Sequence, residues 1–217
     1  LTHHRLEDLQ KVVEQLLALA PEHPGVALLR YDMLQSLGQR SAAEEVIRRA
    51  SERLPQSGDL KRRLASVRYS RGRFAQALRD LTLPVKIQDR QFRLRGDDAD
   101  LVTGMHQTIG AHVLRGVFLL ALNRPMEALQ AYQEELRQSR QRSTFFNRHL
   151  GAIAWFGIAA AKQRMRRPGV AQAWAKGEAA LKALLGTVKN PNIVLHMVLE
   201  AYVAELPRRV LVLARRH

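Results

Sequence analysis

The histidines of this sequence are the side chains best suited to acid–base or metal chemistry, and their spacing argues against both. The chain has eight histidines and no cysteine. His106 and His112 are six residues apart, which places them about 240° apart around a helix, so they do not share a face. The sequence contains no His-Glu-x-x-His pattern and no glycine-rich phosphate loop. We therefore expect a non-catalytic protein with no metal and no cofactor.

One acidic cluster could attract a cation. The stretch GDDAD occupies residues 96–100. It lacks the alternating ligands and the closing glutamate of a calcium loop. We interpret it as a solvated loop or the start of a helix.

Arginine sets this chain apart. Its 217 residues include 35 lysines and arginines, of which 28 are arginine, against 20 aspartates and glutamates, for a net charge of +15. The excess is uneven: residues 1–60 carry −2, residues 61–135 carry +5 and residues 136–217 carry +12. Such a basic half favours an acidic partner, nucleic acid or an anionic membrane surface, although a genome rich in arginine codons gives the same bias. The expected basic patch comprises Arg137, Arg140, Arg142, Arg148, Arg164, Arg166 and Arg167.

A spacing of 34 residues indicates which elements position these side chains. Pro21 and Pro55, Gly38 and Gly72, and Ala43 and Ala77 are each 34 residues apart, as are Leu9 and Ala43. The stretch between Pro21 and Pro55 predicts one helix over Val26–Leu37, a turn at Gly38 and a second helix over Ser41–Arg53. Proline then ends the second helix.

This pattern resembles the tetratricopeptide repeat family, whose units are helix pairs of 34 residues. The resemblance implies an all-α, right-handed α-solenoid of antiparallel helix pairs. About four units can be aligned over residues 1–190, with an insertion near residues 84–108 that begins at Pro84, and residues 191–217 form one or more capping helices. In the third unit Asn123 replaces the turn glycine, and the fourth unit supplies Ala171 and Ala175 as packing residues.

The resemblance also implies a concave groove lined by the first helix of each unit. Projected inward, these helices offer a polar wall and an apolar wall. The candidate partner-binding residues are Arg62, Tyr69, Val117, Leu120 and Phe156. Family members that clamp a terminal carboxylate place asparagines near the basic residue, and Arg62 has Ser66 instead, so we do not expect a clamp. An alternative is that the apolar residues are core.

The predicted function is a protein–protein interaction adaptor that holds a helix or peptide of a partner protein, or this chain's own segment 191–206, in the groove. In bacteria, the resemblance implies assembly of envelope, secretion or regulatory complexes. The alternative is a basic helical repeat that binds single-stranded nucleic acid, because the stretch at residues 137–149 mixes arginine with two phenylalanines, or an anionic membrane surface.

The longest apolar run, Gly151–Ala161, is too short to span a bilayer and fits a buried helix. The first residues are polar and do not resemble a signal peptide. We expect a cytoplasmic protein, or one held at the inner membrane by a segment outside this chain, and a periplasmic location stays open.

Overall fold

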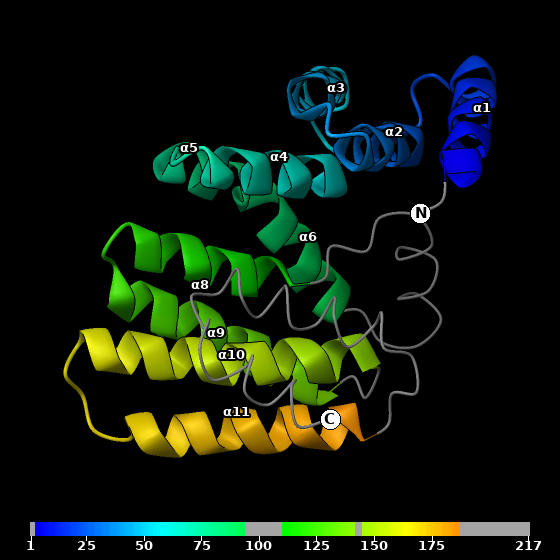
Figure 1. Ribbon diagram of the computed structural model, residues 1–217. Helices are drawn as coiled ribbons and strands as arrows, with labels where there is room; N and C mark the ends of the chain where they lie inside the picture. Colours follow the sequence, from blue (N-terminus) through cyan, green and yellow to red (C-terminus); the bar gives the residue numbers. More distant parts are fainter. Residues whose placement is uncertain (1–2, 94–109, 142–144, 187–217) are drawn as a thin grey trace. The chain divides into compact units, whose positions relative to one another are not determined.

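The computed structural model describes residues 3–93, 110–141 and 145–186, and every regular element among them is a helix (Figure 1). The predicted cap at residues 191–217, Arg142 and residues 94–108 of the predicted insertion lie outside the described residues. The helices are α1 (His3–Leu19), α2 (Pro24–Ser36), α3 (Arg40–Arg53), α4 (Gly58–Ser70), α5 (Phe74–Asp80), α6 (Thr82–Arg93), α8 (Ala111–Ala121), α9 (Pro125–Gln141), α10 (Phe145–Arg164) and α11 (Val170–Leu185).

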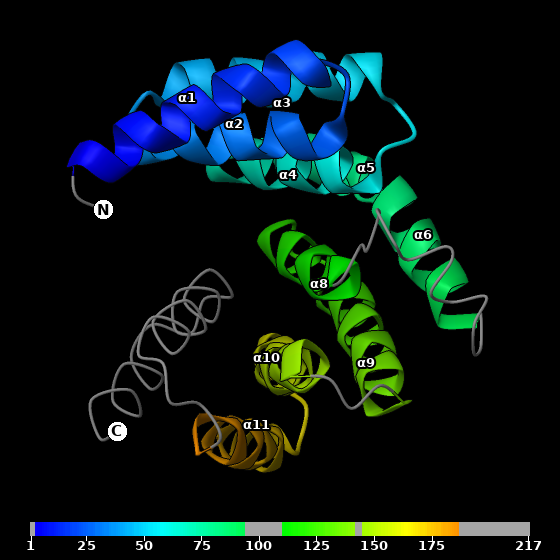
Figure 2. The same cartoon turned by 90° about the vertical axis from the view of Figure 1, so that its right-hand side faces the viewer.

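The chain divides into two compact units, Leu1–Thr108 and Ile109–His217. In the first unit α2 packs on α3 and α4 packs on α5, while α3 also contacts α4. In the second unit α8 packs on α9, and α10 packs on both α9 and α11 (Figure 2). The predicted all-α arrangement of consecutive helix pairs is confirmed, and the predicted helices Val26–Leu37 and Ser41–Arg53 correspond to α2 and α3.

The first helix of every pair ends in the same turn. A residue with left-handed backbone follows the helix, and the next residue donates its N–H to the carbonyl five positions back, as in a Schellman motif. The left-handed residues are Gly38, Gly72, Asn123 and Arg166. Asparagine adopts this conformation more easily than other residues with a side chain, so the expected replacement of glycine by Asn123 is confirmed by its φ of 55°.

Small residues let the two helices of each pair approach. Ala43, Ala77 and Ala128 each lie five residues after the turn residue, and all three are fully buried. The fourth pair differs from the prediction, because Pro168 and Gly169 make its turn two residues longer. Ala173 therefore takes the equivalent buried place, and Ala171 is exposed.

The core of the second unit is built around one tyrosine. The Tyr132 side chain on α9 is fully buried, and its ring packs against Gly116 on α8 and Gly157 on α10. A Cβ added at Gly116 would lie 2.5 Å from Cζ of this ring. The absence of side chains at these two glycines is therefore what admits the ring between the helices.

Pro84 interrupts the regular pattern without ending the helical structure. The short helix α5 ends at Asp80, and α6 begins at Thr82 and packs against α4 and α5. Pro84 is buried in the first turn of α6, where the missing N–H breaks no helical hydrogen bond. The expected insertion is thus helical as far as Arg93.

At the beginning of the chain, helix α1 packs on α2 and buries Val13. Val12 and Leu19 of the same helix stay exposed. Of the helices that the structure describes, none combines the length and the apolar character needed to cross a membrane.

Candidate functional site: a basic groove between three helices

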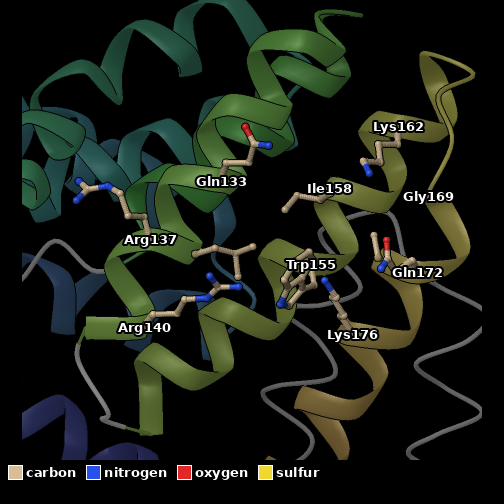
Figure 3. Close-up of a pocket in the computed structure, with 11 residues that line it drawn as sticks. Gln133, Arg137, Arg140, Trp155, Ile158, Lys162, Gly169, Gln172 and Lys176 are labelled. Atoms are coloured by element: carbon tan, nitrogen blue, oxygen red, sulfur yellow. The ribbon is translucent and has the colours of Figure 1, made fainter.

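The strongest candidate for a site is an open groove of about 540 Å³ on the second unit (Figure 3). The helix α10 lies between α9 and α11, and the groove follows the line where the three helices meet. We call it the basic groove. Its lining residues are Gln133, Leu136, Arg137, Arg140, Trp155, Ile158, Lys162, Gly169, Gln172, Ala173 and Lys176.

Each helix contributes one face to the basic groove. The lining residues of each helix recur at intervals of three or four positions, with adjacent pairs at 136–137 and 172–173, so they lie on one side of the helix. α9 supplies residues 133, 136, 137 and 140, α10 supplies 155, 158 and 162, and α11 supplies 172, 173 and 176. The groove is therefore built from three regular, rigid elements.

The bottom of the groove is apolar. Leu136, Ile158 and Ala173 come from the three different helices, and each is buried. An aliphatic side chain placed here would leave water for a surface already formed by packed helices.

A tryptophan anchors two cations above this floor. The Lys176 Nζ lies 4.7 Å from the centroid of the Trp155 ring, and the Arg140 guanidinium carbon lies 6.0 Å from it. Figure 3 shows the two side chains reaching the ring from α11 and α9. Such cation–π contacts are worth about 0.5–1 kcal/mol at exposed sites, so they favour positions of these side chains near the ring.

The cations of the groove have few carboxylate partners. Arg137 forms a two-pronged ion pair with Glu134 on its own helix, with Nε donating to Oε2 over 2.9 Å. Hydrogen bonds from Arg137 and then Gln138 lower the pKa of the Glu134 carboxyl to about 2. Among the described residues, no carboxylate pairs with Arg140, Lys162 or Lys176, and no lining residue is acidic.

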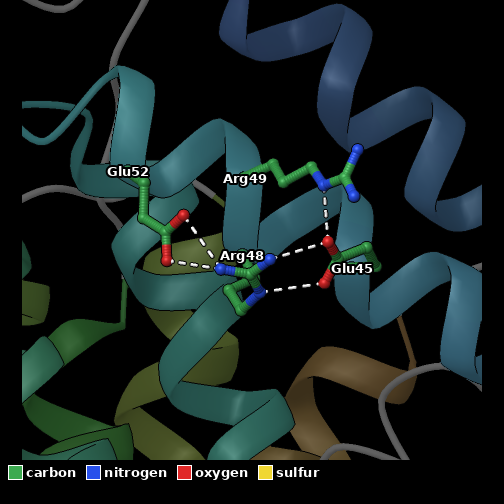
Figure 4. A network of polar contacts seen from close by, with 4 residues as sticks. All are labelled: Glu45, Arg48, Arg49 and Glu52. Atoms are coloured by element: carbon green, nitrogen blue, oxygen red, sulfur yellow. Dashed lines mark hydrogen bonds and ion pairs between the residues drawn. The ribbon is translucent and has the colours of Figure 1, made fainter.

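The arginines of α3 provide a contrast within the same chain. Arg48 is held between Glu45 and Glu52, and Arg49 also donates to Glu45 (Figure 4). The hydrogen bonds from Arg48 and Arg49 lower the pKa of Glu45 to about 2. These exposed pairs contribute little stability, but they neutralise the basic side chains locally. Among the described residues, Arg137 of the basic groove is paired in this way, whereas Arg140, Lys162 and Lys176 are not, so these three cations carry the positive charge that the groove presents.

The backbone at one end of the groove adds to the positive potential. Gly169, with a φ of 82°, is the N-cap of α11 and makes no side-chain hydrogen bond to the first turn. The N-terminus of a helix carries partial positive charge. Together with the cations, this favours a negatively charged ligand. Among the described residues that line the groove there is no histidine, carboxylate or hydroxyl, and the cations can bind an anion.

The expected basic patch is only partly a single site. Arg137 and Arg140 line the basic groove. Arg148, Arg166 and Arg167 are exposed but do not line it. Arg164 does not line the groove either, and its guanidinium donates a hydrogen bond to the Leu120 carbonyl at the end of α8.

The residues of the expected apolar wall are buried in the structure. Val117, Leu120 and Phe156 are 5%, 3% and 1% exposed, because they pack between helices of the second unit. Phe156 contacts the Trp174 ring, with centroids 5.2 Å apart. These three side chains are core residues here, as the alternative expectation stated, and contact with a partner through them stays a prediction.

The expected polar wall lies on α4 of the first unit. Arg62 and Tyr69 are both half-buried and are seven residues apart, on one side of the helix. The Tyr69 ring packs on Phe74, with centroids 5.1 Å apart. Neither residue lines the basic groove, and partner binding through them also stays a prediction.

The sequence interpretation missed Trp155, Lys162 and Lys176 as a site. Their helical spacing relative to Ile158 and Gln172 was present in the sequence, but it does not tell which faces of three helices meet. The longer turn at Pro168–Gly169 also shifts the register of α11.

A second groove, of about 460 Å³, lies among α1, α2 and α3 of the first unit. Its lining mixes signs, with Glu22 and Glu45 beside Arg30, Arg49 and Arg53. Because Arg49 pairs with Glu45 inside this second groove, the second groove presents less unpaired charge than the basic groove does.

No family model matches the sequence, and no curated protein matches it. Among solved structures, the chain is similar to a chain in the crystal structure of the APC/C hetero-tetramer Cut9-Hcn1, with 15% sequence identity and a TM-score of 0.41. The match covers 97% of this chain and 46% of that chain, so this chain spans about half the length of the one it matches. The family resemblance therefore stays a prediction from the residues.

Proposed function

We propose that this chain is a non-catalytic helical-repeat module, of the kind that the tetratricopeptide resemblance implies, and that it binds another protein. Its helices pack in consecutive pairs and leave open grooves where neighbouring helices meet. Stacked helix pairs offer long surfaces suited to peptides and helices of partners. Assembly of a larger complex is the corresponding biological role.

The observation that carries the proposal is the basic groove. It is about 540 Å³ in volume, within the usual range of binding pockets of about 300–1,000 Å³. It combines an apolar floor with three cations that have no ion-pair partner among the described residues. Partner proteins provide both kinds of complementary group, apolar side chains and carboxylates.

A second candidate function is binding of single-stranded nucleic acid. Trp155, Arg140 and Lys176 supply the kinds of group that it would use, because aromatic rings and cations together bind bases and phosphates. An anionic membrane surface would use the same cations without the tryptophan.

Cross-linking capture with the full chain as bait separates these functions. The lysate of the source cell is treated with nuclease or left untreated, and the bait is washed at low and high salt. We expect a partner protein that persists after nuclease and then forms a complex with the bait when both are purified. Capture that depends on nucleic acid and falls steeply with salt would instead support the second candidate, because counterion release governs such binding.

A further inference from the structure

We propose that the basic groove binds an acidic linear segment of a partner protein. The carboxylates of this segment would pair with Arg140, Lys162 and Lys176. An aliphatic side chain between the acidic residues of the segment would pack on the apolar floor formed by Leu136 and Ile158. This inference rests on the proposed function and specifies the chemistry of the partner.

Charge complementarity is the first argument. The three cations come from three helices, so a ligand lying along the groove meets charge on both sides. None of the three pairs with an acidic residue in the part of the chain that the structure describes. Residues 136–217 carry a net charge of +12, which attracts an acidic segment and repels a second copy of this chain.

The occupation of the Trp155 ring by two cations of this chain is the second argument, and it favours a peptide ligand over nucleic acid. The Trp155 ring already has Lys176 and Arg140 over it, at 4.7 and 6.0 Å from the centroid. A stacked base would have to displace a cation that it also needs for its phosphate. A peptide carboxylate can pair with the same cations while they stay over the ring.

The apolar floor is the third argument. Leu136 and Ile158 line the groove, where their exposed fractions of 7% and 4% leave a small apolar surface for a ligand. A branched aliphatic side chain fits such a surface. A sugar–phosphate chain has no apolar side chain to place there. The expected motif is therefore one aliphatic residue with acidic residues on either side.

The test measures binding of a fluorescein-labelled peptide of alternating glutamate and leucine by fluorescence anisotropy, using the full chain. The groove variant is Arg140→Gln/Lys176→Gln. The control is Arg167→Gln/Lys182→Gln, which removes the same charge at exposed positions outside the groove, one of them on α11 itself. A peptide with glutamine in place of glutamate, thymidine oligonucleotides and phosphatidylglycerol vesicles are tested as competitors.

We expect the groove variant to weaken peptide binding about tenfold, with each lost pair worth about threefold, and the control to change it less than twofold. The glutamine peptide should not compete. Equal weakening by both variants would overturn the inference, because attraction would then depend on net charge alone. Stronger competition by the oligonucleotide or the vesicles would also overturn it, in favour of those ligands.

The intrinsic fluorescence of Trp155 gives an independent readout. The chain has two tryptophans, and Trp174→Phe leaves Trp155 as the single one while keeping a ring against Phe156. The peptide should change its emission. If the peptide fails but cross-linking capture still yields a partner protein, the acidic-segment inference is wrong and the proposed function stands. If capture fails as well, both are wrong.

Discussion

Gly116→Ala should destabilise the second unit, because its new methyl group would enter the space of the Tyr132 ring. The added Cβ would lie 2.5, 2.6 and 2.8 Å from three ring carbons, whereas carbon atoms in contact prefer about 3.5–4.0 Å. The ring must therefore move by about 1 Å. It cannot move freely, since the ring is fully buried and Gly157 lies against it from α10.

Overpacking of this kind costs about 1–3 kcal/mol. Alanine recovers about 1 kcal/mol of helix propensity relative to glycine. With the ring confined between two helices, we place the overpacking cost near the upper end and expect a net loss of about 2 kcal/mol. For a chain of this size that corresponds to a fall of about 4–8 °C in Tm.

The assay is thermal and urea unfolding followed by circular dichroism. The control is Gly186→Ala, where the nearest atom to an added Cβ is 3.7 Å away. In a Tyr132→Leu background the cost of Gly116→Ala should largely disappear, since the clashing ring atoms are gone. A Gly116→Ala variant as stable as the wild type would refute the packing described for the three helices.

Three further predictions test the turns, the register and the ion pairs. Asn123→Val should lower the free energy of unfolding by about 1–2 kcal/mol, because a β-branched residue resists the left-handed backbone; urea unfolding measures this, and Asn123→Gly should show no loss. Ala173→Val should lower Tm through overpacking, while Ala171→Val should change the free energy of unfolding by only about 0.5 kcal/mol. A larger loss of stability for Ala171→Val than for Ala173→Val would instead support the register expected from the sequence. The ion pair with Arg137 lowers the pKa of the Glu134 carboxyl to about 2, below its ordinary value of about 4.3. The ionised Glu134 therefore stabilises the fold above about pH 4.3, and this stabilisation is lost as the pH falls toward 2. Glu134→Gln should therefore flatten the pH dependence of urea unfolding between pH 5 and 2, and an unchanged slope would contradict the assignment.

The helix pairs could be predicted from the sequence because their signals are local. Gly38 and Gly72 mark turns that require left-handed backbone, and Ala43 and Ala77 mark close helix contacts. These features depend on residues within one pair, so their spacing alone located α2, α3 and the turn at Gly72. In the fourth pair the prediction of Ala171 as a packing residue was wrong, because the spacing cannot reveal a turn that is two residues longer.

The basic groove could be predicted only in part, because it depends on contacts between pairs. The arginine excess indicated Arg137 and Arg140, but their relation to Trp155 and Lys176 follows from the packing of α9 and α11 on α10. The burial of Phe156 could not be predicted from the sequence for the same reason. A projection error of one residue turns a helical side chain by about 100°, which exchanges groove for core.

The most direct test of partner binding through the basic groove is site-specific photo-cross-linking in the source cell. A photoreactive phenylalanine analogue replaces Gln172, an exposed groove residue, and in a control replaces Lys182 on the same helix outside the groove. Our account predicts a discrete cross-linked protein from position 172 only, joined through an acidic segment that also contains an aliphatic residue. Equal cross-linking from both positions, or cross-links to nucleic acid alone, would contradict it.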